Sequence, residues 1–114
     1  MRHLILRRER ALACFATKYD CVVNRNRGEF LDWLTGQDLP RLMLQGVGVP
    51  VRNGETVTLD IGEEAATFFV AAYLEKRVLI TEAAEIPAGE QDVRFVVRTE
   101  YDGYRRLTLT LEQE

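Results

Sequence analysis

The side chains that most often carry out chemistry are sparse in this sequence. It contains one histidine, His3, and two cysteines, Cys14 and Cys21. A zinc site built from these residues would need all three to converge with a carboxylate, because zinc normally takes four such ligands. A cysteine nucleophile would need the histidine within hydrogen-bond reach, and nothing in the spacing favours that arrangement. We therefore expect no catalytic residue, no metal site and no cofactor, and we predict that the protein is not an enzyme.

The two cysteines are predicted to be free, partly buried thiols. On one extended segment, about seven steps of 3.3 Å would separate Cys14 from Cys21 by roughly 23 Å. A disulfide needs Cα atoms no more than about 7 Å apart. A tight turn at residues 17–18 could bring the cysteines together, but a reducing compartment disfavours the bond. We expect both cysteines to be unbridged.

Basic residues are concentrated near the start of the chain, namely Arg2, Arg7, Arg8, Arg10, Lys18, Arg25 and Arg27. Residues 1–52 hold nine Lys or Arg and five Asp or Glu, whereas residues 53–114 hold six and thirteen. With Tyr19, Phe30 and Trp33 as stacking platforms, the basic residues could bind single-stranded nucleic acid. However, the net charge of the chain is −3, and the arginines alternate with apolar residues as solvent-facing strand positions do. We therefore predict surface salt bridges and do not expect nucleic acid as a partner.

The size and composition predict one folded domain over residues 1–114. A hydrophobic fraction of 46% and a charged fraction of 29% are those of an ordinary globular protein. No apolar run approaches the roughly 18 residues of a membrane helix, and the apolar run at the start is too short for a signal peptide. We expect a soluble, cytoplasmic protein that does not associate with a membrane.

The clearest strand pattern lies near the C-terminus. Apolar and polar residues alternate over residues 93–100 and again over residues 107–112, which predicts two strands of a hairpin. A three-residue loop over residues 101–103, with Gly103 left-handed, keeps the apolar side chains of both strands on one face. That loop predicts the pairs Val97 with Leu107, Phe95 with Leu109 and Val93 with Leu111.

A second hairpin is predicted over residues 47–61. The loop over residues 52–54, with Gly54 left-handed, pairs Val49 with Val57 and Val47 with Leu59. Pro50 lacks an N–H group, so its strand is expected at a sheet edge or at a bulge.

The segment over residues 63–77 allows two interpretations. Its acidic start, basic end and alanines suit a helix. Its bulky neighbours Phe68, Phe69, Val70 and Tyr73 would make a helix apolar nearly all round, so we favour a strand over residues 67–73. A further strand is predicted over residues 78–86, and the alternations at residues 3–7 and 19–24 add two more.

These elements predict an all-β protein, an antiparallel β-sandwich of seven to nine short strands. One short helix over residues 29–34, or a loop insertion, interrupts them. A small β-barrel and an α+β fold are the alternatives.

The order of these patterns resembles small, mostly uncharacterised bacterial β-sandwich domains of the PEGA-like type. The resemblance rests on Leu6-Arg7-Arg8, on Cys14-Phe15, on Lys18 to Asn24 and on Val51 to Leu59. It implies a β-sandwich in a bacterial protein and transfers no functional residue. Residues 28–46 are an insertion relative to that pattern.

This inserted segment is the candidate interaction surface. It is unusually apolar, and the residues that we expect to bind a partner are Phe30, Leu31, Trp33, Leu34, Leu42 and Met43. The alternative is that the segment is a core plug, with every apolar side chain buried in the monomer. We predict a non-enzymatic protein-interaction or structural module whose partner is a second copy or another protein, bound through this segment or a sheet edge. The alternative function is a ligand-binding sandwich for carbohydrate or single-stranded nucleic acid.

Overall fold

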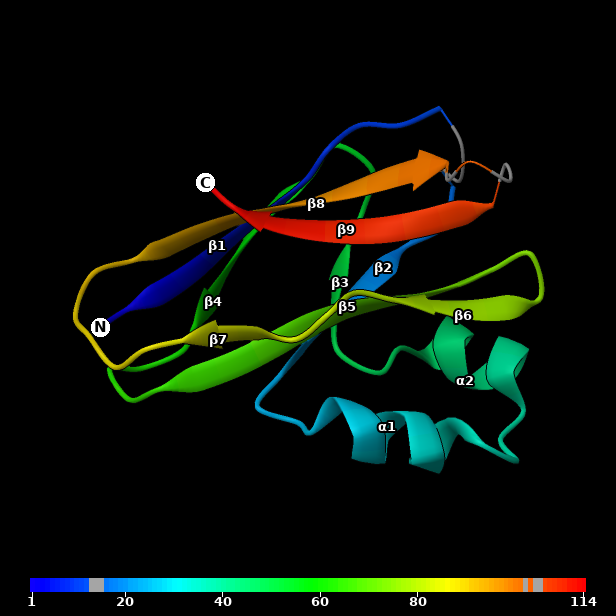
Figure 1. Ribbon diagram of the computed structural model, residues 1–114, viewed down its shortest axis with the longest axis horizontal. Coiled ribbons are helices and arrows are strands. Elements are labelled where there is room, and N and C mark those ends of the chain that lie inside the picture. Colours follow the sequence, from blue (N-terminus) through cyan, green and yellow to red (C-terminus); the bar gives the residue numbers. More distant parts are fainter. Residues whose placement is uncertain (13–15, 102, 104–105) are drawn as a thin grey trace.

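The computed structural model describes residues 1–12, 16–101, 103 and 106–114. These residues form two β-sheets that pack face to face, with two short helices on the outer face of one sheet (Figure 1). Sheet A has the order β4 (Thr56–Asp60), β1 (His3–Arg8), β8 (Val93–Tyr101) and β9 (Leu107–Gln113). Sheet B has the order β3 (Val49–Val51), β2 (Tyr19–Val23), β5 (Ala66–Leu74) and β6 (Arg77–Ile80), and β7 (Ala84–Ile86) also pairs with β5.

The main core lies between the two sheets. Leu4 and Leu6 of β1 and Phe95 and Val97 of β8 point into it from sheet A, opposite alternate residues of β2 and β5. Phe68 and Phe95 meet edge to face across the layers, with ring centroids 4.9 Å apart. The period-2 alternation of these strands therefore places one face of each sheet in a shared interior.

Strand β5 is buried on both faces. Phe68 and Val70 point into the main core, whereas Phe69 and Ala71 point to the opposite side, beneath the helices. This explains why the segment is apolar all round without being a helix, because a central strand covered on both faces needs no polar side. The prediction of a strand over residues 67–73 is confirmed.

The mostly β architecture with two sheets is confirmed, but three finer predictions need correction. The protein is not strictly all-β, because α1 (Arg27–Leu34) is followed by a second helix, α2 (Leu39–Gln45). It is not wholly antiparallel, because β1 and β8 run parallel. The described strands also leave both sheets open, so they form no closed barrel. Pro40 lies in the first turn of α2, where proline fits a helix, and this was a usable signal for the helix.

The predicted register of the C-terminal hairpin is wrong. Val97 pairs with Leu111 and Tyr101 pairs with Leu107, so the connection covers residues 102–106 instead of three residues. The observed partner of each residue is displaced from the predicted one by an even number of residues. Because side chains alternate with a period of two, the apolar faces were still predicted correctly. The Arg77 guanidinium, which donates to the Leu107 carbonyl at 2.7 Å, holds the start of β9 beside β6. The predicted conformation of Gly103 belongs to this connection, most of which lies outside the described residues.

Residues 47–61 do not form a hairpin. Strand β3 pairs with β2 in sheet B, and β4 pairs with β1 in sheet A, so the turn between them crosses from one sheet to the other. Gly54 has the predicted positive φ, at 74°, and the Glu55 N–H donates to the Arg52 carbonyl at 2.9 Å. A turn that closes a hairpin and a turn that rounds a corner use the same local residues, so the sequence pattern alone does not distinguish them.

Two arginines are buried at the two ends of β1. Arg2 donates to the carbonyls of Gly62, Glu64 and Pro87 at 2.6–2.8 Å. Arg8 donates to the carbonyls of Thr17 and Val51 at 2.6 and 3.0 Å. The prediction that these arginines face solvent is therefore wrong, because their side chains follow the inward parity of Leu4 and Leu6.

Arg8 also joins the two sheets. Its guanidinium carbon lies 3.4 Å from the centre of the Tyr19 ring on β2, and the Tyr19 hydroxyl is 2.6 Å from the Thr99 hydroxyl on β8. A guanidinium over an aromatic face is attracted by the ring quadrupole, and this attraction is stronger in a buried site than in water. Arg8 and Tyr19 thus connect strands of sheet A and sheet B through one polar cluster.

We predict that Arg8→Met lowers the free energy of unfolding by about 2–4 kcal/mol, because it strands two buried carbonyls without a donor. Urea denaturation monitored by circular dichroism measures this. Arg7→Met is the control, since Arg7 is half exposed and pairs with Glu114 at 3.2 Å. It should change stability by no more than about 0.5 kcal/mol. Equal effects of the two variants would contradict the role given to Arg8.

Cys21 is a free thiol buried in the main core, as expected, and Cys14 lies outside the described residues. Burial, followed by the nearby Asp20 carboxylate, raises the pKa of the Cys21 thiol to about 12. Because the thiolate is the reactive form, Cys21 should be inert in the folded protein. In Cys14→Ser we expect no reaction with a thiol-specific disulfide reagent until urea unfolds the chain. Rapid modification of the folded variant would contradict this.

Candidate functional site

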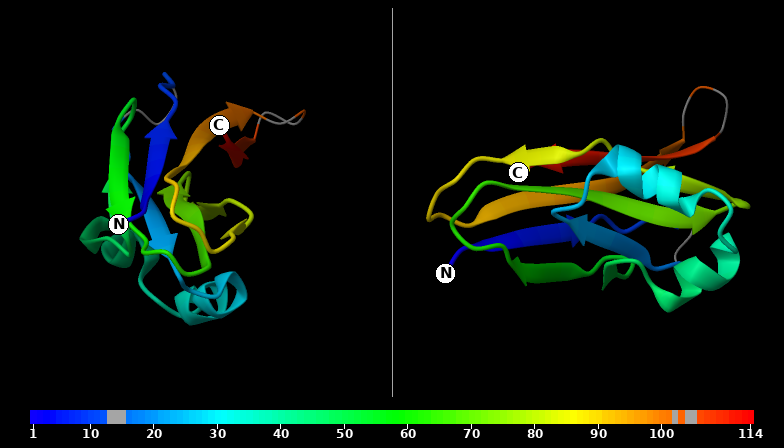
Figure 2. Two further views of the ribbon diagram at one scale, coloured as in Figure 1. Left: turned by 90° about the vertical axis from the view of Figure 1, so that its left-hand side faces the viewer. Right: turned by 90° about the horizontal axis from the view of Figure 1, so that it is seen from below.

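Helices α1 and α2 cover the outer face of sheet B (Figure 2). The Asn26 side chain accepts from the Glu29 N–H at 2.9 Å and begins α1, as an N-cap residue does. Gly46 ends α2 with a φ of 91°, and its N–H donates to the carbonyls of Leu42 and Met43. The covered strand residues are Val22, Phe69 and Ala71.

The residues predicted to form an interaction surface divide into three groups. Phe30, Leu34 and Met43 are buried against sheet B and form a second core with Val22, Phe69 and Ala71. Leu31 and Leu42 are half-buried at the border of that core. Trp33 is 40% exposed. The segment therefore covers a sheet face, and only part of it is available to a partner.

Trp33 is held in place by its neighbours. Its ring centroid lies 6.0 Å from that of Phe30, and the Arg25 guanidinium lies 5.0 Å from both rings. One face of the indole is thus engaged by a cation from its own chain. This arrangement favours a structural role for Trp33 over a platform for a sugar ring.

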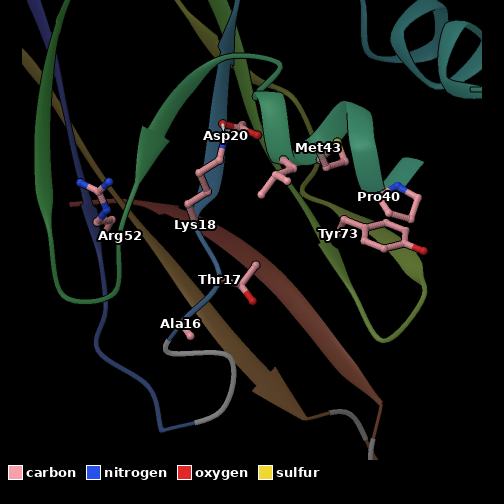
Figure 3. A pocket seen from close by; sticks show the side chains of 9 residues that line it. Ala16, Thr17, Lys18, Asp20, Pro40, Met43, Arg52 and Tyr73 are labelled. Atoms are coloured by element: carbon pink, nitrogen blue, oxygen red, sulfur yellow. Dashed lines mark hydrogen bonds and ion pairs between the residues drawn. The ribbon is translucent and has the colours of Figure 1, made fainter. Parts of the chain in front are cut away.

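A hollow of about 400 Å³ opens where α2 ends and the cover over sheet B stops. We call it the α2 pocket. Figure 3 shows Lys18 and Asp20 on one side of it and Pro40, Met43 and Tyr73 on the other. The residues that line it are Ala16, Thr17, Lys18, Asp20, Pro40, Met43, Leu44, Arg52 and Tyr73.

Four segments bring these side chains together. Lys18 and Asp20 share the outer face of β2, and Asp20 pairs with Ala71 of β5 and Pro50 of β3. Tyr73 extends from the same outer face of β5. The pocket therefore depends on the alternation of β2 and β5 and on the placement of α2 across them.

Asp20 is a buried carboxylate in the wall of the pocket. Asp20 is 1% exposed, and its Oδ1 lies 3.3 Å from the Nζ of Lys18. The backbone N–H of Val47 also donates to it. Burial raises the pKa of Asp20 above its ordinary value, and the charge and hydrogen bond of Lys18 oppose that rise.

Gly46 leaves the space that this ion pair occupies. A Cβ atom at Gly46 would lie 3.0 Å from the Lys18 Nζ. The positive φ of Gly46 is also one that other residues adopt at a cost. The glycine that ends α2 therefore shapes the pocket as well.

The carboxylate in the lining, Asp20, is already engaged by its neighbours. Asp20 is tied to Lys18 and Val47, and no group of three or more possible metal ligands occurs within the described residues. His3 lies on the outer face of sheet A and pairs with Asp92 at 3.4 Å, whereas Cys21 faces the main core. The structure therefore does not bring these two residues together.

Sequence patterns missed Lys18, Asp20, Arg52 and Tyr73 as members of one site. Asp20 alternates with Tyr19 and Cys21, so the pattern indicates an ordinary solvent-facing position. The available signal was that Asp20 shares its face with Val22, whose burial requires a cover on that side of the sheet. The helical cover that places α2 beside Asp20 was not predicted.

The basic residues of the N-terminal half, which could have formed a surface for nucleic acid, do not gather on one face in the described part of the chain. Arg2 and Arg8 are buried, Arg7 pairs with Glu114, and Lys18 pairs with Asp20 in the α2 pocket. Arg25 lies over Phe30 and Trp33 on α1. Of the basic residues for which surface salt bridges were predicted, Arg7 forms one, with Glu114.

Comparison with known proteins gives no match among family models, curated proteins or solved structures. Neither helix in the described part of the chain is long and apolar enough to cross a membrane.

We predict that Asp20→Asn changes how stability depends on pH. Because the pKa of Asp20 is raised on folding, its stabilisation is fully present below the ordinary value of 3.8 and is lost as pH rises through the raised pKa. The difference in unfolding free energy, wild type minus Asp20→Asn, should therefore fall as pH rises from below 3.8 through the raised pKa. Urea denaturation across this range measures it.

Asp92→Asn provides a control of opposite sign. The hydrogen bond from the His3 N–H is the main cause that lowers the pKa of the exposed Asp92 carboxyl. Its stabilisation is present above the ordinary pKa and is lost as pH falls, so the corresponding difference should rise with pH. A difference for Asp20→Asn that also rises with pH would contradict the desolvated state of Asp20.

Proposed function

We propose that this protein is a non-enzymatic interaction module that holds a short segment of a partner protein in the α2 pocket. The observation that carries the proposal is a hollow of about 400 Å³ lined by both apolar and charged side chains. Binding sites of this size are typically apolar, with a few fixed polar groups that orient the occupant. The proposal places the module in the bacterial cytoplasm, on the sequence grounds given above.

The lining favours an occupant that carries a large apolar side chain beside a carboxylate. Pro40, Met43 and Leu44 offer apolar contact. Lys18 and Asp20 neutralise each other, so Arg52 is the charge left in the lining. A guanidinium pairs well with a carboxylate, and charge at the rim of a site selects among partners more than it adds affinity.

Leu44 supports a role for the rim of the pocket. It is 80% exposed, although it is an aliphatic residue in a helix whose neighbour Met43 is buried. An exposed aliphatic side chain beside an apolar hollow adds area that a partner would bury. It also offers a position that can be changed without disturbing either core.

The alternative ligands receive less support. Binding of single-stranded nucleic acid would use a continuous basic surface, but the arginines of the N-terminal half are divided among the interior, ion pairs and α1. Binding of a carbohydrate would use an open aromatic face, and Trp33 already has Arg25 over its ring. We therefore favour a protein segment as the occupant.

The test uses two acetylated pentapeptides that alternate charged residues with leucine or phenylalanine, one with glutamate and one with lysine. We expect the acidic peptide to shift the NMR signals of Tyr73, Leu44 and Asp20 and to bind at least about tenfold more tightly than the basic one. Equal binding of both peptides, or shifts confined to residues outside the pocket, would overturn the proposal. A short oligothymidylate and maltotriose, titrated in the same way, test the two alternative ligand classes.

Two variants locate the binding. Arg52→Glu should weaken the acidic peptide about tenfold by replacing attraction with repulsion. Leu44→Asp should weaken it as well, by placing a carboxylate at the rim. Arg94→Glu makes the same charge change on the outer face of sheet A and should leave the affinity unchanged. If Arg94→Glu weakens binding as much as Arg52→Glu does, the effect comes from net charge and the pocket is not the site.

A further inference from the structure

Strand β4 forms one edge of sheet A, and its backbone is paired on one side only. It pairs with β1, and no other strand in the described part of the chain pairs with it. The Arg8 N–H donates to the Glu55 carbonyl, and the Ile61 N–H donates to the Arg2 carbonyl. In an antiparallel ladder alternate residues face the same neighbour. The N–H and carbonyl groups of Val57 and Leu59 therefore point toward β1, whereas those of Thr56, Thr58 and Asp60 point away from it.

Two edge strands of sheet B, β3 and β6, carry features that discourage pairing with another chain. Strand β3 contains the exposed Pro50, which has no N–H to donate. Strand β6 is short and begins at Arg77, whose guanidinium also covers the start of β9 by bonding to the Leu107 carbonyl. Proteins commonly protect edges with proline, basic side chains or covering groups. Strand β4 contains no proline and no basic side chain over Thr56–Asp60, and its one charged residue, Asp60, stands at its end.

The sequence of β4 is complementary to itself. An antiparallel pair of two copies centred on Thr58 would place Thr58 opposite Thr58, Val57 opposite Leu59 and Thr56 opposite Asp60. Val57 and Leu59 pack against the main core yet stay partly exposed at the edge, so this pairing would extend the apolar interior across both copies. Threonine pairs on the outer face are favourable, and no like charges meet.

The register also matches the free hydrogen-bonding groups. Pairing centred on Thr58 brings even-numbered residues opposite even-numbered residues, and these are the residues whose backbone groups point away from β1. A centre lying between two residues would instead set even-numbered residues opposite odd-numbered ones, whose backbone groups already bond to β1. Gly54 and Gly62, with φ values of 74° and 66°, turn the chain away at the two ends and limit the pair to this strand.

We propose that β4 is a self-association edge through which two copies of this chain join their A sheets into one continuous eight-stranded sheet about a two-fold axis at Thr58. The surface is separate from the α2 pocket, which lies on the outer face of sheet B. A two-fold pairing of one edge closes on itself, so the product is a dimer and not a fibre.

The first test is sedimentation velocity of the full chain from about 10 μM to about 1 mM, a range that suits an interface of this small size. We expect a monomer–dimer equilibrium. Thr58→Lys should abolish the dimer because it sets two ammonium groups against each other at the axis. Thr110→Lys is the matched control on the same face of sheet A, on β9 at the opposite edge, and should dimerise like wild type. Circular dichroism verifies that both variants are folded.

The second test does not depend on the folding of Thr58→Lys. In the Cys14→Ser background, Thr58→Cys should form a disulfide-linked dimer when oxidised with diamide, because directly opposed residues lie within disulfide reach. Thr110→Cys in the same background should stay monomeric. Hydrogen exchange adds a site-specific reading, since the amide of Thr58 should exchange more slowly at high protein concentration than at low concentration.

Three results would overturn the proposal. They are a wild-type monomer at every concentration, a dimer that survives Thr58→Lys, and equal cross-linking of Thr58→Cys and Thr110→Cys. Peptide binding in the α2 pocket is measured independently, so it should be unchanged in Thr58→Lys. A loss of dimerisation alone thus bears on the edge and not on the pocket.

Discussion

The contact between Arg8 and Tyr19 is the interaction on which the two-layer arrangement depends most. A charged side chain in an apolar interior is tolerated only when its donors and its charge are engaged. Here the guanidinium lies on the Tyr19 ring and donates to carbonyls of Thr17 and Val51, while Tyr19 reaches Thr99 in the other sheet. Apolar contact alone holds two sheets together without fixing their alignment. These directional contacts fix where β1 lies over β2 and β3.

The second determinant is the helical cover of sheet B. It converts the outer face of β5 into interior and gives the protein two cores that share one strand. The cover is shorter than the face beneath it, and the α2 pocket occupies the remainder, with Met43 and Tyr73 on the side opposite Lys18 and Asp20 (Figure 3). The same packing that buries Phe30 and Leu34 therefore creates the place where a partner can bind. Stability and the proposed function come from one segment.

The sequence patterns predicted well which residues of a strand face the core. They predicted poorly which strands pair with each other. Which residues of β8 and β9 face the core followed from alternation, and even the misplaced register kept those faces. Which strand β4 joins depended on β1, far away in the chain, and no local turn residue carries that information. Arg2 and Arg8 were assigned to solvent because charge was weighed above parity, whereas the backbone carbonyls that receive them exist only in the folded protein. The α2 pocket was missed for the same reason, since its residues come from four separate segments.

The parallel pairing of β1 with β8 has a consequence for how the chain is made. His3–Arg8 is synthesised early, yet one of its two neighbours in sheet A is Val93–Tyr101. Contacts between such distant segments form slowly because a long loop must close first. Leu4 and Leu6 therefore stay uncovered on the ribosome until most of the chain has emerged, which is the interval in which exposed apolar strands attract chaperones or aggregate. The chain is therefore most exposed to aggregation during translation, when β1 still lacks its neighbour β8.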